Sequence, residues 1–271
     1  MSVQAAARVS VRVTEHVAEV ALRRPEKHNA LDRGMFDALC EAIDELTAKP
    51  SARAVVLRGE GPSFCSGLDF PSFIAAGSGP EELGIRRAGE QVNLAQRVTH
   101  GWRSLAVPVI AAVHGACFGG GLQIALAADV RIGAPSARLS AMEIEYGLIP
   151  DMGISETLPR LVRDDLAREL LYTGRIVDAA EATELGLLTR LEDDPVAAAR
   201  ALAVEVASRS PDAVRAAKRL ANEAFWAVPE QGLALEAELQ RTLLGTPNQV
   251  AAVTAKLGGQ APEFADPQPS A

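Results

Sequence analysis

Three consecutive glycines, Gly119 to Gly121, lie between an apolar stretch and a run of helix-forming residues. Because glycine has no Cβ, its backbone can approach a ligand closely. The first N–H groups of a helix have no partner within the helix and carry the positive end of its dipole. The N–H of Gly120 is therefore a candidate donor to a negatively charged oxygen. An ordinary tight turn is the alternative explanation of these three residues.

A second glycine-containing segment can supply a partner for that N–H group. Gly67 lies in the segment 62–70, soon after the apolar run 54–58, which predicts a buried strand. A sharp bend at Gly67 would turn the N–H of Leu68 toward the same pocket. Two convergent main-chain N–H groups form an oxyanion hole, which stabilises an enolate or a tetrahedral oxyanion.

Three polar side chains could complete such a site. A carboxylate near an oxyanion hole indicates proton transfer beside a carbonyl, and Glu143 is the candidate, with an exposed surface carboxylate as the alternative. Asp151 is either a second carboxylate or the N-cap of a helix that starts near Gly153. Gln123 is neutral, so it can orient a water or a thioester but cannot exchange a proton. It is equally well explained as a polar residue on a half-buried helix.

Together these motifs resemble the crotonase superfamily, which is also called the enoyl-CoA hydratase/isomerase family. The similar features extend from Leu22 to Leu187, and the strongest is the segment 108–115 that leads into the triple glycine. The resemblance implies an α/β fold, a crotonase-like spiral of ββα units with a C-terminal helical region. It also implies that the N–H groups of Leu68 and Gly120 bind the carbonyl of an acyl-CoA thioester. That thioester would be the substrate, and no separate cofactor is expected.

The match departs from the hydratases at one catalytic position. Hydratases of this family use two carboxylates, whose positions correspond to Gln123 and Glu143 here. Because a general acid or base contributes about 10²–10⁴ in rate, Gln123 favours isomerisation or weak hydration over efficient two-glutamate hydration. Glu143 matches the base of the family's isomerases. The dienoyl-CoA isomerase branch is similar in having an aspartate at the position of Asp151, although it also has an acid at the position of Gln123.

A non-catalytic acyl-CoA-binding protein with a degenerate site is the alternative function. In either case, the resemblance places the nucleotide end of CoA near Arg24 and near residues 66–71. The candidate residues for CoA and substrate binding are Arg24, Lys27, Ala30, Ser66, Asp69 and Phe70. The cations among them could meet the phosphates of CoA, whereas an ordinary solvated turn is the alternative. Asp69 could instead only brace its own loop.

Composition argues against several other classes of protein. The net charge of −8 and the isoelectric point near 5.2 argue against nucleic-acid binding. Three irregularly spaced cysteines indicate reduced thiols rather than a disulfide framework, which favours the cytoplasm. We expect no membrane span, because no apolar stretch is long enough. We also expect no metal site, because the histidines have no companion ligands at metal-binding spacing.

The apolar periodicity predicts the elements that must position these residues. They are a hairpin of strands at 9–13 and 17–22, a helix at 32–48, a strand at 54–58, a mobile loop at 71–80, a helix at about 82–104, a strand at 109–113, a helix from 120 and a strand at 129–132. Alternation of strands and helices implies parallel strands joined by crossovers. Beyond about residue 195, prolines precede Ala-, Leu- and Glu-rich runs, as they do at helix starts.

These patterns divide the chain into three parts. Residues 1–195 form a core that holds the CoA and acyl site, residues 196–257 a C-terminal helical region, and residues 258–271 a tail that we predict to be disordered. The resemblance implies that the helical region assembles a homotrimer or a hexamer, a dimer of trimers. The sequence itself shows only apolar helix faces, which packing within one chain explains equally well.

Overall fold

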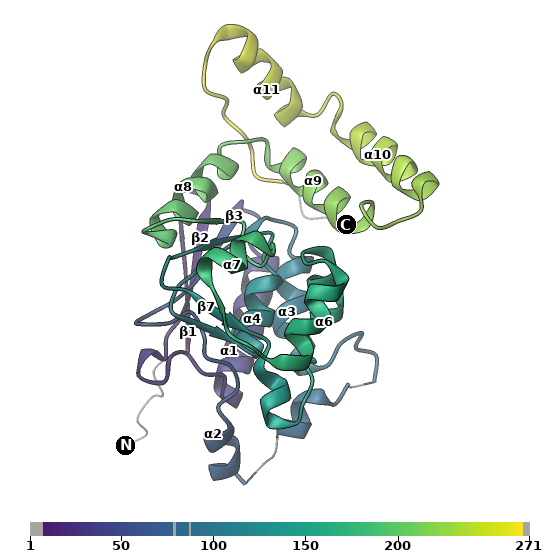
Figure 1. Cartoon of the computed structure of the whole chain (residues 1–271). Coiled ribbons are helices and arrows are strands. Elements are labelled where there is room, and N and C mark those ends of the chain that lie inside the picture. The colour runs from purple at the N-terminus through teal and green to yellow at the C-terminus, as the bar shows by residue number, and fades with distance from the viewer. Residues whose placement is uncertain (1–7, 78–79, 87, 268–271) are drawn as a thin grey trace.

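A six-stranded sheet lies at the centre of the computed structural model, which describes residues 8–77, 80–86 and 88–267 (Figure 1). In spatial order its strands are β1 (Val9–Thr14), β2 (Val17–Leu22), β3 (Ala54–Gly59), β4 (Val109–Val113), β6 (Val130–Gly133) and β9 (Arg190–Leu191). The first two form the antiparallel hairpin that the sequence predicts. Each later strand pairs with its neighbour in parallel. The prediction of parallel strands with crossovers is therefore confirmed.

A smaller sheet continues directly from the end of β4. Its strands are β5 (Ala116–Phe118), β7 (Arg138–Ser140) and β8 (Val177–Asp178). The first pair is parallel and the second antiparallel. Because only a short turn separates β4 from β5, the chain passes from the large sheet to the small one just before the triple glycine.

Most of the remaining chain is helical. The α-helices are α1 (Arg33–Thr47), α2 (Phe70–Ala75), α3 (Leu94–Ser104), α4 (Gly120–Leu126), α5 (Ile154–Thr157), α6 (Asp164–Thr173), α7 (Ala179–Glu184), α8 (Pro195–Ala207), α9 (Pro211–Glu223), α10 (Pro229–Leu243) and α11 (Pro247–Gly258). The 3₁₀ turns are η1 (Pro25–Lys27), η2 (Pro80–Gly84), η3 (Met142–Tyr146) and η4 (Leu158–Arg160). Among the described residues, no helix is both long enough and apolar enough to cross a membrane.

Helices cover both faces of the large sheet. On one face, α1, α3 and α4 share an apolar core with Val55 and Leu57 of β3. On the other face, α8 packs against Ala54 and Val56 of the same strand. Successive residues of a strand point to opposite faces, so a strand buried on both sides is apolar nearly throughout, as β3 is.

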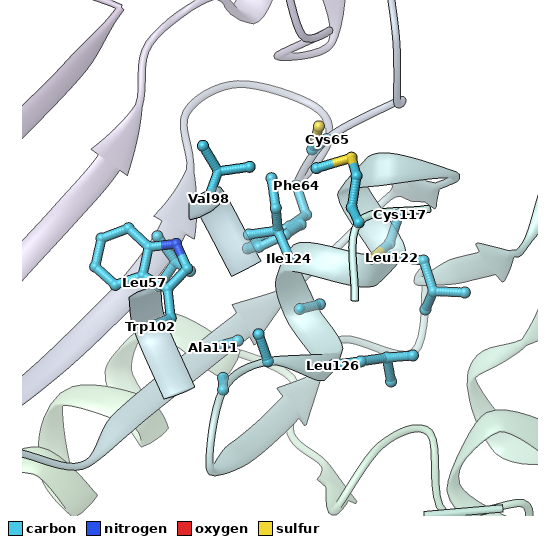
Figure 2. Close-up of a cluster of buried hydrophobic side chains, with 14 of the residues drawn as sticks. Leu57, Phe64, Cys65, Val98, Trp102, Ala111, Cys117, Leu122, Ile124 and Leu126 are labelled. Atoms are coloured by element: carbon cyan, nitrogen blue, oxygen red, sulfur yellow. The ribbon is translucent and has the colours of Figure 1, made fainter. Parts of the chain in front are cut away.

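The main core surrounds α4, a helix of seven residues that are all buried. Figure 2 shows Ile124 and Leu126 of this helix in the same cluster of buried side chains as Trp102 of α3 and Leu57 of β3. A helix this short is not stable by itself in water. Tertiary packing therefore determines where its N-terminus, and with it Gly120, is held.

The helix predicted at 32–48 is confirmed as α1. The Asp32 side chain accepts a hydrogen bond from the Met35 N–H at 2.9 Å, which is the N-cap interaction typical of a helix start. Leu39 and Ile43, which share the predicted apolar face, are both buried.

The helix predicted at about 82–104 is shorter than expected. It begins only at Leu94, because Asn93 and Gln96 form a reciprocal capping box in which each side chain accepts a hydrogen bond from the other's N–H. Ahead of this box the chain forms η2 and irregular structure instead of the predicted helix.

The segment predicted as a mobile loop at 71–80 contains most of α2. Asp69 caps this helix, and Pro71 lies in its first turn, where proline is favoured because the missing N–H is not needed. Proline is common in loops as well as in first helical turns, and here it marks a helix start. Residues 78 and 79 of the predicted loop lie outside the described residues.

The C-terminal helices begin where the sequence predicts. Helices α8, α9 and α10 start at Pro195, Pro211 and Pro229, and α11 starts at Pro247 in the same way. Figure 1 shows α10 and α11 extending away from the sheet, whereas α8 lies on it. The division of the chain into a core and a helical region stays a prediction.

The last described residues of the chain form hydrogen bonds with the rest of the protein. Arg53 donates to the Phe264 carbonyl at 2.9 Å and pairs with Asp266 at 3.0 Å. Asn248 and Ala265 exchange two hydrogen bonds. These partners lie upstream in the chain and leave no local sequence pattern, and the predicted disorder of residues 258–271 stays a prediction. Residues 268–271 lie outside the described part of the chain.

An ion pair between buried Lys218 and exposed Asp129 joins α9 to the core. Lys218 Nζ lies 2.8 Å from Asp129 Oδ2 and donates to the carbonyl oxygens of Trp102 and Val107. Burial lowers the pKa of this lysine, an effect that the charge of Asp129 opposes. The ammonium group satisfies three oxygens at once, so its removal would leave them without this donor.

Replacement of Lys218 by methionine should lower the free energy of unfolding by about 1–3 kcal/mol, because the carbonyl oxygens of Trp102 and Val107 lose their charged donor. Urea unfolding monitored by circular dichroism measures this change. Lys256→Met on exposed α11 is the matched control and should change stability by less than about 0.5 kcal/mol. A Lys218→Met protein as stable as that control would contradict the role given to this ion pair.

Candidate active site

A cavity of about 430 Å³ opens beside the N-terminus of α4. Its wall contains all the residues that the sequence singled out for catalysis or an oxyanion hole, namely Leu68, Gly120, Gln123, Glu143 and Asp151. Ser66 and Phe70, two of the candidates for CoA or substrate binding, also line it. Residues that are scattered along the chain thus meet at one cavity.

The two glycine-containing segments are joined by main-chain hydrogen bonds. Cys65 and Cys117 form an isolated parallel bridge. In this bridge the Cys65 N–H donates to the Ala116 carbonyl, and the Phe118 N–H donates to the Cys65 carbonyl, both at 3.0 Å. The bridge lies just before Gly67 in one segment and just before Gly119 in the other, so it brings both bends to the same place.

Glycine is required where these segments touch. Gly67 has a φ of +90°, and a Cβ on this residue would lie 2.9 Å from the Phe118 carbonyl oxygen. A Cβ on Gly121 would overlap the Cys65 carbonyl oxygen. Glycine adopts this conformation and allows this approach because it has no side chain.

The main-chain N–H groups of Leu68 and Gly120 are both available. Leu31 donates its N–H to Gly67 and accepts one from Asp69, so the N–H of Leu68 between them faces away from this pairing. Gly120 is the first residue of α4, where an N–H has no partner within the helix. Within the described residues, neither N–H donates to a protein acceptor.

The side chain of Gln123 is held at both ends by protein groups. Its Oε1 accepts a hydrogen bond from the Met152 N–H at 2.8 Å, and its Nε2 donates to Glu143 Oε1 at 2.7 Å. The residue is only 2% exposed. The sequence predicted that Gln123 would orient a water or a thioester, but its observed partners are a main-chain amide and the candidate base.

The carboxyl group of Glu143 lies against the oxyanion segment. A Cβ on Gly119 would be only 3.3 Å from Glu143 Oε1. Burial raises the pKa of Glu143, the negative charge of Asp151 raises it further, and the hydrogen bond from Gln123 opposes both. Its Oε2 is buried and has no hydrogen-bond partner within the described residues. The raised pKa brings the pH at which this carboxyl group takes up and releases a proton closer to neutral.

Asp151 lies at the same cavity without capping a helix. Helix α5 follows Gly153 and has no side-chain cap, so the alternative role of Asp151 as its N-cap is excluded. Burial raises the pKa of Asp151 as well. Two carboxyl groups, each with a raised pKa, therefore face one cavity.

Arg24 does not present its charge to a ligand. Its guanidinium group lies 2.6 Å from Asp69, donates to the Ala30 carbonyl at 3.0 Å and contacts Ser72, with the residue only 6% exposed. An internal ion pair with Asp69 thus engages the charge of Arg24, and the predicted contact of Arg24 with CoA phosphates stays a prediction. Asp69, which also caps α2, braces its own loop as one interpretation held.

The other candidates for CoA binding lie around this ion pair. Lys27 is exposed, so its charge is available at the surface, whereas Ala30 is buried. Ser66 and Phe70 are half-buried at the cavity, and the Phe70 ring packs against Tyr146 with ring centres 4.9 Å apart.

Two residues that the sequence analysis did not single out hold the site together. Asn29 is fully buried, and its Nδ2 donates to the carbonyls of Glu60 and Ser63, which fixes the chain just before the Cys65 bridge. A positive φ of 56° at Asn29 is a conformation that asparagine tolerates. Met152 acts through its main chain, which no side-chain pattern could have revealed.

Neither thiol nor metal chemistry is indicated. Burial raises the pKa of Cys65 to about 12 and that of Cys117 well above its ordinary value, so both thiols stay protonated. Among the described residues, no group of three or more His, Cys, Asp and Glu side chains is arranged to hold a metal ion.

Known proteins share both the sequence and the fold. The family model for enoyl-CoA hydratase/isomerase matches residues 12–264. A Bacillus subtilis (strain 168) protein that carries the enoyl-CoA hydratase/isomerase name is 37% identical over 82% of this chain and 84% of its own length. The mitochondrial Δ(3,5)-Δ(2,4)-dienoyl-CoA isomerase of Rattus norvegicus is 34% identical over 77% of this chain and 67% of its own length.

Solved structures agree with these relatives. The crystal structure of an enoyl-CoA hydratase from Bacillus anthracis superimposes with a TM-score of 0.85 and 30% identity, covering 95% of this chain and 98% of that one. The fold is thus the crotonase-like α/β fold with C-terminal helices that the sequence predicts. The chain belongs to the enoyl-CoA hydratase/isomerase family of enzymes, within the crotonase superfamily.

Proposed function

We propose that this protein isomerises an unsaturated acyl-CoA thioester, with hydration at most a weak side reaction. One observation supports this most directly: Glu143 lies beside two unpartnered main-chain N–H groups, while the second position used by hydratases holds the neutral Gln123. A single base is sufficient to move a proton from one carbon to another. Addition of water benefits from a second acid or base, which Gln123 cannot provide.

The oxyanion hole would act on the thioester carbonyl. When a proton leaves the neighbouring carbon, negative charge develops on the carbonyl oxygen. The N–H groups of Leu68 and Gly120 would stabilise this charge, and a single donor of this kind contributes about 10²–10³ in kcat. Their position at the cavity beside Glu143 supports this assignment.

Glu143 would carry the proton. Its raised pKa makes it a better acid after it has acted as a base, which suits a residue that must do both in one turnover. In a 3-enoyl to 2-enoyl isomerisation, the proton leaves carbon 2, resides on the carboxyl group, and is delivered to carbon 4. Asp151 would assist as a second carboxyl group when the conjugated system is longer, as in a 3,5-dienoyl thioester.

The cavity favours an uncharged, apolar acyl chain. Apolar side chains line most of it, including Phe36, Leu83 and Met142. Its charged lining residues are Glu143 and Asp151, both acidic, so an acyl group with its own carboxylate would be repelled. We propose that Lys27, Ala30, Ser66, Asp69 and Phe70 contact CoA or the acyl group, and that Arg24 supports them through Asp69.

The remaining features of the function are also proposals. No separate cofactor is needed, because a carboxyl group and main-chain amides supply all the proton transfer and charge stabilisation. A cytoplasmic location is supported by the three cysteines, which are all free and buried. A homotrimer or hexamer is supported by large apolar side chains left exposed on and beside α10, such as Trp226, Leu233 and Leu244.

Turnover of 2-enoyl-, 3-enoyl- and 3,5-dienoyl-CoA, followed by chromatography, tests the proposed reaction. We expect isomerisation to exceed hydration of the 2-enoyl thioester by at least tenfold. Glu143→Gln should lower kcat by about 10²–10⁴, because it removes the base. Glu145→Gln, an exposed neighbour in η3, is the matched control and should keep wild-type activity. Thermal stabilisation by acyl-CoA without any product would instead favour the non-catalytic binder.

Asp151→Asn should move the acidic limb of the pH–rate profile to lower pH. Glu143 works as a base only when ionised, so activity falls as pH drops through its raised pKa. Removal of the charge at position 151 lowers that pKa. The profile of kcat/KM for a 3-enoyl-CoA measures the shift. An unchanged acidic limb would show that the charge of Asp151 does not act on the base.

Leu233→Asp combined with Leu244→Asp should reduce the molecular mass in solution from that of a trimer or hexamer toward a monomer. The reason is that charges would be placed on faces proposed to be buried between subunits. Light scattering after gel filtration measures the mass. Glu236→Asp on the same helix is the control, and a wild-type protein that is monomeric at all concentrations would refute the assembly.

A further inference from the structure

We propose that Gln123 is a positioning residue that holds the Glu143 carboxyl group in one orientation and leaves only its Oε2 atom to carry the substrate proton. The proton that leaves one carbon of the substrate then returns to another carbon of the same molecule instead of exchanging with solvent. This inference rests on the proposed isomerisation and adds a specific role for the residue that replaces the second hydratase acid.

The orientation of the Gln123 amide follows from its partners. The Met152 main-chain N–H can only donate, so the atom that faces it at 2.8 Å must be the carbonyl Oε1. The NH₂ group therefore faces Glu143, and Oε1 of that carboxyl group accepts its hydrogen bond at 2.7 Å. A flipped amide would place two donors together at one end and two acceptors together at the other.

Met152, which donates its N–H to Gln123, is itself held in place. The Met152 carbonyl accepts a hydrogen bond from the Thr99 hydroxyl of α3, so the main chain of Met152 is fixed between α3 and α4. Met152 also packs against the oxyanion segment, since a Cβ on Gly120 would lie 2.8 Å from its Sδ. The carboxyl group of Glu143 is thus tied to the same packed elements that hold the N–H of Gly120.

One carboxyl oxygen remains for chemistry. Oε1 is engaged by Gln123, whereas Oε2 has no hydrogen-bond partner within the described residues and is shielded from water. In the reaction, a C–H bond of the substrate breaks and an O–H bond forms on Oε2, with the electron pair moving toward the thioester. The O–H bond then breaks as a C–H bond forms at the other end of the allylic system. Water cannot easily replace that proton in between.

The first test needs no turnover. Gln123→Met keeps an unbranched side chain of similar length but loses both hydrogen bonds. Because the hydrogen bond from Gln123 stabilises the ionised carboxyl group, its loss should raise the pKa of Glu143. Carbon-13 NMR of protein labelled at the glutamate carboxyl carbons measures this, with the Glu143 signal assigned by its absence in Glu143→Gln. Asp151→Asn is the counterpart and should shift the same pKa downward.

The second test measures how much deuterium from the solvent enters the product. Wild-type enzyme that converts a 3-enoyl-CoA in D₂O should place little deuterium at carbon 4 of the product. Gln123→Met should incorporate at least threefold more, because a mobile carboxyl group exchanges its proton before delivering it. Its kcat should fall about 10²-fold through misplacement of the base, while KM stays within threefold. Thermal unfolding of each variant verifies that the fold is kept.

The outcomes separate this inference from the proposed function. If wild-type protein turns over none of the three thioesters, the proposed isomerisation fails, while the NMR titration still decides whether Gln123 holds Glu143. An unchanged pKa of Glu143 in Gln123→Met, or equal deuterium incorporation in wild type and variant, overturns the inference. If Gln123→Met does not fold, Gln123→Glu serves in its place. In that variant the carboxyl group at position 123 and that of Glu143 must share a proton. The acidic limb of the pH–rate profile should therefore move to higher pH.

Discussion

The Cys65–Cys117 bridge is the interaction on which the rest of the site depends. Two main-chain hydrogen bonds of 3.0 Å connect the segment after β3 to β5, and each segment turns at a glycine directly afterwards. Without this bridge, the N–H groups of Leu68 and Gly120 would belong to unrelated parts of the chain. Its burial in the core, with both cysteines fully inaccessible, excludes the water that would compete for these hydrogen bonds.

Helix α4 then connects this main-chain site to the side-chain chemistry. Its first residue offers an unpartnered N–H, and one turn later it carries Gln123, whose amide reaches the candidate base. All of its residues are buried, so the core that surrounds it in Figure 2 fixes the oxyanion hole and the base relative to each other. Side chains that make no contact with a substrate therefore determine the geometry in which the chemistry would occur.

The amide at position 123 fits its surroundings in a way that a carboxylate would not. The Met152 N–H needs an acceptor, and the Glu143 carboxylate needs a donor. An amide offers one of each, whereas a carboxyl group could serve both only when protonated. Gln123 therefore does more than replace an acid, because its carbonyl and its NH₂ group each have a protein partner, and one oxygen of Glu143 is left free.

The sequence by itself determined the local structure and the motif residues. Alternating and helical periodicity predicted the first hairpin, α1 and the parallel strands, and the glycines with Glu143 pointed to one family. Only the tertiary structure decided the partners: Arg24 with Asp69, Gln123 with Met152, and Arg53 with the chain end that was predicted to be disordered. The reason is physical. Secondary-structure preferences act between neighbours along the chain, whereas hydrogen-bond and ion-pair partners are set by sheet register and helix packing between residues far apart in sequence.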